Sequence, residues 1–396
     1  MKILLAAASF ATNISGIQRH ALSLARCLLL RPEVSALHLV VSPWQSDFAQ
    51  IAGLSSDARL STHIADISHN AISRNLWYYR RLPELAAQLQ SDIVHLSFPV
   101  PCNGAAFNCP TVVTLHDMYP YEIPMNFGFP KFIFNRVILQ QCIRSVDAIA
   151  CVSDATQNRL KQYAPSSVWK KAVRIYNCVE PEPVSAADSP IPGWTGEPFL
   201  LCVAQHRRNK NIATLIRSFH SLMRSGEIEA GFKLVVVGIR GPESGNIKRL
   251  VANCGLIGNV VFLQGLTEPA LQWCYRHCAV LVAPSLTEGF GLPVAEGLLA
   301  GSLIICSDIP AHREIADGYC HFVSLRTYPM EALAAAIADT LHEPKGEAIS
   351  IPRLSASALA EQYIALYRRL VTSSALAQSA RVAAGINIST SESQSL

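Results

Sequence analysis

Two glutamates separated by seven residues stand in the part of this chain whose residue types are best suited to chemistry. Glu288 and Glu296 are the acidic members of the segment Thr-Glu-Gly-Phe-Gly-Leu-Pro-Val-Ala-Glu. Gly289 and Gly291 let an anion approach the backbone closely. Pro293 suits the start of a helix, because its missing N–H would have no partner there. A helix N-terminus attracts negative charge, so the segment predicts a diphosphate-binding site.

The two carboxylates suit different parts of a ligand that carries a diphosphate. We expect Glu296 in the first helical turn, where a carboxylate can accept hydrogen bonds from both vicinal hydroxyls of a ribose. Glu288, one loop earlier, would reach a sugar. The predicted donor loop also contains Gly289, Phe290, Gly291 and Leu292. Taken singly, each glutamate is better explained by an ordinary role, Glu288 as a solvated loop residue and Glu296 as a complement to the helix dipole.

A basic run after an apolar segment supplies cations. Arg207 and Lys210 follow the apolar run Phe-Leu-Leu-Cys-Val. They could neutralise a diphosphate leaving group, Arg207 through its planar guanidinium and Lys210 through its compact ammonium charge. Arg208 is adjacent to Arg207 and could bind the phosphate in its place. The basic run could also be a solvated loop that binds no phosphate.

Two segments of the first half of the chain add candidates. His116 and Asp117 follow the apolar run that ends at Leu115, where a histidine could bond a sugar hydroxyl or move a proton. We predict that His116, Asp117 and the nearby Tyr119 bind the acceptor, although a structural histidine and a loop that packs on its own domain are the alternatives. Gly16, after the first apolar run, would admit the donor phosphates.

These elements, in this order, resemble the retaining glycosyltransferases called group 1, or family 4, over roughly residues 1–371. The resemblance implies the GT-B fold, with the second glutamate on the nucleotide ribose and the first on the donor sugar. It implies transfer with retention of anomeric configuration. It also implies no metal and no cofactor, because cationic side chains take the metal's place and the nucleotide-sugar is a substrate. The residues carried over as catalytic are His116, Arg207, Lys210 and Glu288.

The sequence departs from the family pattern at two places. Ala204 stands where the family usually has glycine before its basic loop, and Ser15 precedes a single glycine in a loop that usually has two. Both departures fall on the parts of the site that would hold phosphate.

Short apolar runs alternate with helical patterns through the whole chain. This alternation is typical of parallel sheets covered on both faces, so the fold class is α/β with two doubly wound, Rossmann-like domains that face across a cleft. The expected divisions are an acceptor-side domain at 1–180, a proline-rich linker at 181–198, a donor-binding domain at 199–355, a helix at 356–372 that the resemblance implies returns to the first domain, and a disordered tail at 373–396.

Composition narrows the class of protein. A chain of 396 residues is long enough for two domains. A net charge of 33 − 29 = +4, without a recognition motif, excludes nucleic acid as a partner. No apolar stretch approaches the length of a membrane span. Twelve scattered cysteines, several in apolar runs, indicate buried thiols in the cytoplasm. Zinc at Cys274, His277 and Cys278 is an alternative that lacks a second ligand pair.

The resemblance therefore implies a metal-independent retaining hexosyltransferase of cell-surface polysaccharide synthesis. The donor is a nucleotide-sugar, with mannose as one candidate hexose, and the acceptor is a saccharide or lipid-linked saccharide. A peripheral place at the inner face of the membrane is a further expectation, whereas the oligomeric state is not predicted. The rival hypotheses are a related epimerase or phosphorylase, and a sugar-nucleotide-binding protein without catalysis.

Overall fold

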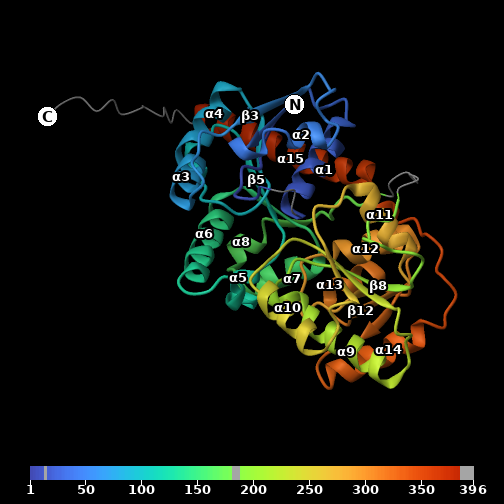
Figure 1. Cartoon of the computed structure of the whole chain (residues 1–396). Coiled ribbons are helices and arrows are strands. Elements are labelled where there is room, and N and C mark those ends of the chain that lie inside the picture. The colour runs from blue at the N-terminus through green and yellow to red at the C-terminus, as the bar shows by residue number, and fades with distance from the viewer. Residues whose placement is uncertain (13–15, 181–187, 384–396) are drawn as a thin grey trace. The chain divides into compact units, whose positions relative to one another are not determined.

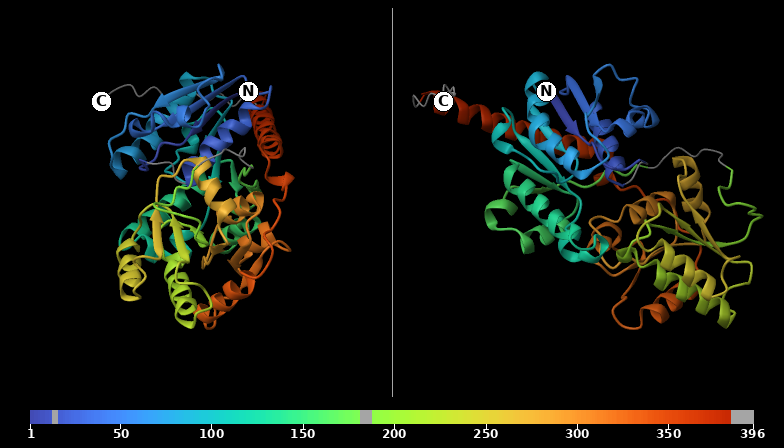
Figure 2. Two further views of the ribbon diagram at one scale, coloured as in Figure 1. Left: turned by 45° about the vertical axis from the view of Figure 1, so that its right-hand side comes forward. Right: turned by 60° about the vertical axis from the view of Figure 1, so that its left-hand side comes forward.

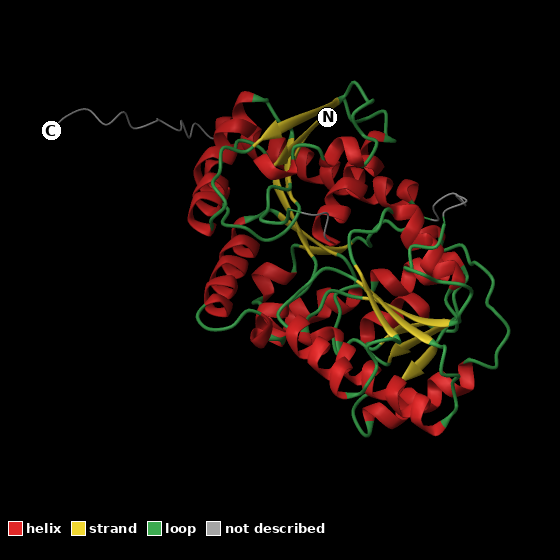
Figure 3. Cartoon of the chain, viewed as in Figure 1, coloured by secondary structure: helices red, strands yellow, loops and turns green. Residues whose placement is uncertain are grey.

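The computed structural model describes residues 1–12, 16–180 and 188–383 (Figure 1). Within these ranges the strands form one seven-stranded and one six-stranded parallel sheet, and helices flank each of them (Figure 3). The predicted class, two doubly wound α/β domains, is confirmed. Residues 181–187 of the expected linker lie outside the described residues.

The first sheet has the strand order β3-β2-β1-β4-β5-β6-β7. Its order reverses beside β1, which pairs with β2 on one side and β4 on the other. The inner strands are mostly apolar because both faces of the sheet are covered, whereas the edge strands β3 and β7 carry polar or charged residues. Their bounds are β1 Lys2–Ala6, β2 Ala36–Val41, β3 Leu60–Ile64, β4 Ile93–Leu96, β5 Thr111–Leu115, β6 Ala148–Cys151 and β7 Ala172–Arg174.

The helices of this half alternate with the strands as the sequence pattern requires. Helix α1 shows the apolar spacing of a helix packed on one face, and its buried side includes Leu24 and Leu28. The helices are α1 Gly16–Leu29, α2 Phe48–Ile51, α3 Ala71–Leu76, α4 Leu82–Gln88, α5 Tyr119–Glu122, α6 Lys131–Ser145, α7 Asp154–Tyr163 and α8 Ser166–Trp169.

The second sheet repeats the arrangement with the order β10-β9-β8-β11-β12-β13. Its order reverses beside β8, between β9 and β11. The strands are β8 Phe199–Val203, β9 Lys233–Val237, β10 Val260–Leu263, β11 Val280–Ala283, β12 Ile304–Ser307 and β13 His321–Val323. The helices are α9 Ile212–Ser225, α10 Ser244–Asn253, α11 Glu268–His277, α12 Leu292–Ala300, α13 Pro310–Ala316, α14 Pro329–Thr340 and α15 Ala356–Ala383.

One apolar core lies between the second sheet and its flanking helices. It includes Phe219 of α9, Leu234 of β9 and Ile337 of α14, all fully buried. Such a core holds the strand ends rigidly, so the loops that leave the carboxyl ends are the places where a ligand of an open α/β sheet binds.

The chain divides into two compact units whose boundaries differ from those of the sheets. One contains residues 1–114, 141–149 and the described part of α15 from Ala360 on, and the other contains residues 115–140 and 150–359. Figure 2 shows α15 in red beside the N-terminal elements of the first unit. There His95 of β4 bonds both the Tyr367 hydroxyl and Thr114, and Thr114 also bonds His20.

Several details differ from the sequence expectations. Strands β3 and β7 do not correspond to apolar runs of the sequence, because β3 is a half-exposed edge strand with polar residues and β7 has three residues. Helix α15 continues to Ala383, past the expected end at 372, since alanine-rich sequence favours helix. The expected disorder of the remaining tail, 384–396, concerns residues that are not described.

None of the twelve cysteines forms a disulfide, and eight of them are buried. Among the described residues, no helix has both the length and the apolar character needed to cross a membrane.

Candidate functional site

Glu288 lies at the centre of a hydrogen-bonded cluster after strand β11. Its Oε1 accepts bonds from Lys210 Nζ at 2.5 Å and Ser285 Oγ at 2.7 Å, and its Oε2 accepts one from Tyr119 Oη at 3.0 Å. The side chains of Lys210 and Glu288 are only 18% and 9% exposed. Burial alone would raise the pKa of Glu288. The charges of Lys210 and His312, with the hydrogen bonds from Lys210 and Ser285, instead hold that pKa below its usual value.

The loop after β8 positions the cations. Arg208–Lys210 form a short 3-10 turn, η5, and the fully buried Asn209 accepts the backbone N–H of Leu286 through its carbonyl at 2.7 Å. This bond ties the basic loop to the loop that carries Glu288. Arg207 is half-buried and bonds Gln205 at 2.7 Å, whereas Arg208 is exposed. The structure therefore turns Arg207 and Lys210 into the site region and Arg208 toward solvent.

Gly289 is a glycine because another backbone segment occupies the space of a side chain. A Cβ there would overlap the carbonyl oxygen of His116. The carbonyl of Gly289 accepts hydrogen bonds from Ser153 Oγ and from Thr156 Oγ1, the latter at 3.0 Å. Ser153 is also the N-cap of α7, so the N-terminus of that helix fixes the loop. Phe290, the next residue, is 4% exposed.

Helix α12 begins one residue earlier than the sequence analysis expected. Gly291 takes a left-handed conformation with φ +98° and is the N-cap, so the helix starts at Leu292 and Pro293 is its second residue. Glu296 is the fifth residue, and the prediction that it lies in the first turn is wrong. Its Oε2 accepts a hydrogen bond of 2.5 Å from the hydroxyl of Tyr275, which the fully buried ring holds in place.

Asp117 is a half-buried carboxyl group beside this cluster. It accepts the backbone N–H of Tyr119 at 2.9 Å. Burial, with the charges of Glu122 and Glu288, raises its pKa to about 6, against the opposing effects of that hydrogen bond and of Arg207. Asp117 therefore holds a proton at pH values where an ordinary aspartate does not.

We predict a specific pH dependence for Asp117→Asn. A raised folded-state pKa means that the native state holds a proton that the unfolded state has lost, so wild-type stability falls as pH rises from about 4 to about 6 and is then flat. The variant lacks this loss. Relative to wild type, it should gain about 1–2 kcal/mol over that interval, after allowance for partial exposure.

Urea unfolding of both proteins at pH 4.5, 5.5 and 7.5 measures this gain. Other carboxyl groups cancel in the difference between the two proteins. A difference that stays constant across the three pH values contradicts the raised pKa of Asp117.

The structure gathers most of the predicted site residues in one unit. Residues 116, 117, 119, 207, 210, 288–292 and 296 belong to the second compact unit, whereas Gly16 begins α1 in the first. Sequence reasoning missed the partners of the two glutamates: Tyr275, Ser285 and His312. No motif marks them, because a tyrosine on a helix and a serine after a strand are common in any α/β domain.

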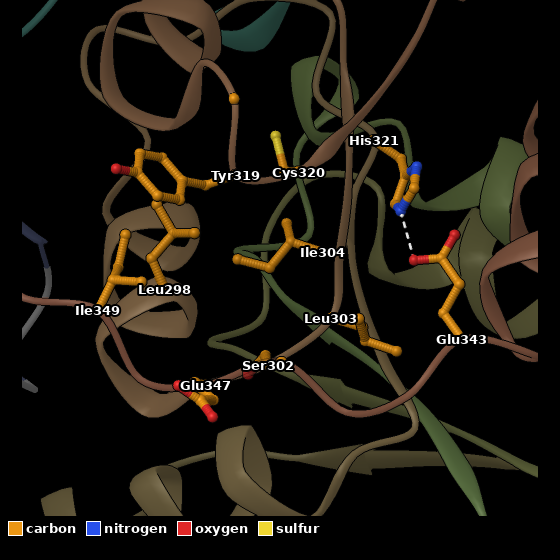
Figure 4. A pocket seen from close by; sticks show the side chains of 12 residues that line it. Leu298, Ser302, Leu303, Ile304, Tyr319, Cys320, His321, Glu343, Glu347 and Ile349 are labelled. Carbon is orange, nitrogen blue, oxygen red and sulfur yellow. Dashed lines mark hydrogen bonds and ion pairs between the residues drawn. The ribbon is translucent and has the colours of Figure 1, made fainter.

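A cavity of about 400 Å³ lies elsewhere, at the amino ends of β12 and β13 (Figure 4). Leu298 and Ile349 contribute apolar surface to it, and His321 pairs with Glu343 at 3.0 Å. It contains none of the predicted site residues.

Within the described part of the chain, no cluster of histidine, cysteine and acidic residues could hold a metal ion, and this includes the alternative at Cys274 and Cys278.

Comparison with known families agrees with the site. Residues 186–352 match the model of glycosyl transferases group 1, and residues 14–183 match that of glycosyltransferase family 4. The two matches follow one another along the chain. The protein belongs to the group 1 glycosyltransferases of the GT-B type, as the resemblance predicted.

Two curated relatives are O-antigen enzymes. The chain is 26% identical to the O-antigen chain mannosyltransferase RfbU of Salmonella typhimurium over 54% of its own length and 56% of that protein. It is 24% identical to the O-antigen chain mannosyltransferase B of Escherichia coli over 80% of its own length and 84% of that protein. The chain thus spans little more than half of the first relative and most of the second.

A solved structure confirms the fold. Anabaena Alr3699/HepE, in complex with UDP and glucose, superposes with a TM-score of 0.63 at 16% identity, over 94% of this chain and 99% of that one.

Proposed function

We propose that this protein transfers a mannosyl group from a nucleotide-activated mannose to a saccharide or lipid-linked saccharide acceptor. The reaction proceeds with retention of configuration and without a metal ion, in the synthesis of a cell-surface polysaccharide. The mannosyl donor is supported by the names of the relatives RfbU and mannosyltransferase B. Other hexoses are the alternatives that the experiment below separates.

The observation that carries the proposal is the pairing of Lys210 with Glu288 beside the start of α12. In this proposal Glu296 binds the ribose and the first N–H groups of α12 meet the diphosphate. Glu288 contacts the donor sugar, while Lys210 and Arg207 neutralise the charge that grows on the departing diphosphate. The half-buried position of Arg207 supports it over Arg208 as the second cation.

The proposed chemistry balances within the two substrates. The bond between the anomeric carbon and the diphosphate oxygen breaks, and the acceptor oxygen bonds to the same face of the sugar. The acceptor proton passes to the departing diphosphate, which leaves as the nucleoside diphosphate. His116, which follows β5, would bond a hydroxyl of the acceptor or the sugar and so orient it.

A panel of nucleotide-sugars tests the donor. Purified protein is incubated in the presence of EDTA with GDP-mannose, UDP-glucose, UDP-galactose and their nucleoside diphosphates, and slow hydrolysis and thermal stabilisation are measured. We expect the largest stabilisation and hydrolysis with GDP-mannose. If the protein prefers a UDP-sugar, the proposed mannosyl donor is wrong. Tight binding with no turnover of any donor would contradict the proposal that the protein is an enzyme.

Glu296→Ala is the matched variant for this panel. Without its carboxylate the ribose loses two charge-assisted hydrogen bonds, so donor and nucleoside diphosphate should both bind about 10- to 100-fold more weakly. Equal affinity of variant and wild type would contradict the assignment of Glu296 to the ribose.

We further propose that the protein attaches peripherally to the cytoplasmic face of a membrane. The observation is a group of exposed apolar side chains between the end of α5 and the middle of α6. Their exposed fractions run from 44% to 81%. An exposed apolar patch of this kind marks an interaction surface. The group consists of Met125, Phe129, Ile133, Phe134 and Val137.

Co-sedimentation with phosphatidylglycerol–phosphatidylethanolamine vesicles tests this attachment. The variant Phe134→Asp/Val137→Asp should lose most of the binding, because a carboxylate resists burial in lipid. Ile257→Asp is the control, since Ile257 is also exposed, at 74%, but lies in the turn between α10 and β10. Equal loss in both variants would contradict a specific membrane face.

A further inference from the structure

The hydroxyl of Tyr119 bonds the carboxylate that the proposed function places on the donor sugar. Tyr119 Oη lies 3.0 Å from Glu288 Oε2 and 3.4 Å from the carbonyl oxygen of Thr287. The carboxylate is the stronger acceptor and the nearer one. The tyrosine therefore donates to Glu288, so this residue, which the sequence analysis assigned to the acceptor, contacts the donor loop.

Tyr119 keeps its proton in this place and therefore donates to the carboxylate. Burial and the negative charges of Glu288 and Asp117 raise its pKa well above its usual value. Its main chain is also fixed, because the backbone N–H is bonded to Asp117 and the carbonyl of Pro120 accepts Arg136 Nε at 2.8 Å. The hydroxyl thus presents one permanent hydrogen to Glu288 from a fixed direction.

The bonds to Glu288 leave it little freedom. An ionised carboxylate has about four lone-pair directions. Lys210 and Ser285 occupy two of them on Oε1, and Tyr119 occupies one on Oε2. Within the described part of the chain these bonds leave one direction on Oε2, where a sugar hydroxyl could donate. Its orientation depends on Tyr119, because the two other partners lie on the opposite oxygen.

We propose that Tyr119 is a positioning residue for the donor sugar: it holds Glu288 with one lone pair of Oε2 directed at a sugar hydroxyl. The inference rests on the proposed donor chemistry. Without the tyrosine hydroxyl, the carboxylate can rotate about the Lys210–Ser285 side and satisfy Oε2 with water. Sugar placement is then lost, whereas the nucleoside diphosphate, which Glu288 does not hold, binds as before.

Tyr119→Phe tests the proposal, because it removes one oxygen and keeps the ring. We expect kcat to fall about 10-fold or more, a typical effect of lost orientation, with the Kd of the nucleoside diphosphate unchanged. Tyr163→Phe is the control, since it also removes one tyrosine hydroxyl and Tyr163 stacks its ring on Tyr121. An unchanged kcat in Tyr119→Phe, or an equal loss of diphosphate affinity, would overturn the positioning role.

A second readout keeps this test separate from the test of the enzyme itself. In the wild-type protein, the nucleotide-sugar should raise the melting temperature more than the nucleoside diphosphate does. In Tyr119→Phe this difference should disappear, while the stabilisation by the nucleoside diphosphate stays the same. This comparison needs no turnover. If the wild-type protein binds a nucleotide-sugar but transfers nothing, the proposed function fails while the role of Tyr119 is still decided by this difference.

Discussion

Lys210→Ala is expected to lower turnover by about two to three orders of magnitude with a much smaller effect on donor affinity. Lys210 is the cation closest to Glu288, with its Nζ 2.5 Å from the carboxylate. Charge on the diphosphate increases as the sugar departs, so a preorganised cation stabilises the transition state more than the ground state. Its removal should therefore appear in kcat, measured with saturating donor.

The same substitution should also destabilise the fold, and this effect must be separated from catalysis. Glu288 is 9% exposed, and without Lys210 its charge has lost its nearest compensation. Breaking a buried ion pair costs about 3 kcal/mol or more. The pKa of Glu288 should rise at the same time, since the charge of Lys210 is a main cause of its low value.

A double variant separates the effect on stability from the effect on catalysis. Lys210→Ala/Glu288→Gln removes the unpaired charge, so its urea midpoint should return most of the way to that of wild type while turnover stays low. If the double variant recovers both stability and activity, Lys210 serves only to hold the loop. If Lys210→Ala alone keeps wild-type kcat, its proposed role in the departure of the diphosphate is refuted.

The fold could be predicted from the sequence because its signal is repeated. Apolar runs such as those of β1 and β9 recur between helical patterns, and a sheet covered on both faces is the ordinary way to bury them. Strands β3 and β7 were missed because β3 has no fully buried residue and so no apolar run, and because a three-residue strand has no period. The length of α15 was underestimated because the serines of its second half are typical of coil, whereas the alanines among them favour helix.

The candidate site could be predicted only in part, for a physical reason. Glu288, Glu296 and their glycines form a local pattern, so sequence spacing identifies them. Tyr275 is 21 residues away from its partner Glu296, and Tyr119 is 169 residues away from Glu288. Such pairs are created by packing between elements, and no spacing rule contains them.

The glycine pattern itself has a meaning that differs from the one expected. The sequence analysis explained Gly289 by the close approach of an anion to the backbone. The structure gives it a neighbour within the protein, the carbonyl of His116, and two hydroxyl donors on its own carbonyl. The segment that follows β5 and the start of α7 thus determine the path of the donor loop, and through it the place of Glu288.

Gly289→Ala is therefore expected to abolish activity, by about three orders of magnitude or more, even though it adds one methyl group. The new Cβ overlaps the carbonyl oxygen of His116 and lies 3.3 Å from Thr156 Oγ1. Neither a backbone carbonyl nor a capped helix start can yield easily. The loop must move, and a displacement of about 1 Å at a reacting group costs about 100-fold in rate, while overpacking costs about 1–3 kcal/mol of stability.

Gly245→Ala is the matched control, because a Cβ at this exposed position in α10 meets nothing within 4 Å. It should retain wild-type activity and gain slightly in stability, since alanine favours helix over glycine. Activity and urea midpoints of the two variants decide between the explanations. If Gly289→Ala is destabilised but retains its turnover, the contact with His116 merely packs the loop, and the position of Glu288 is set by Lys210 and Ser285 instead. A loss of turnover well beyond the loss of folded protein means that the path of this loop is itself part of the catalytic apparatus.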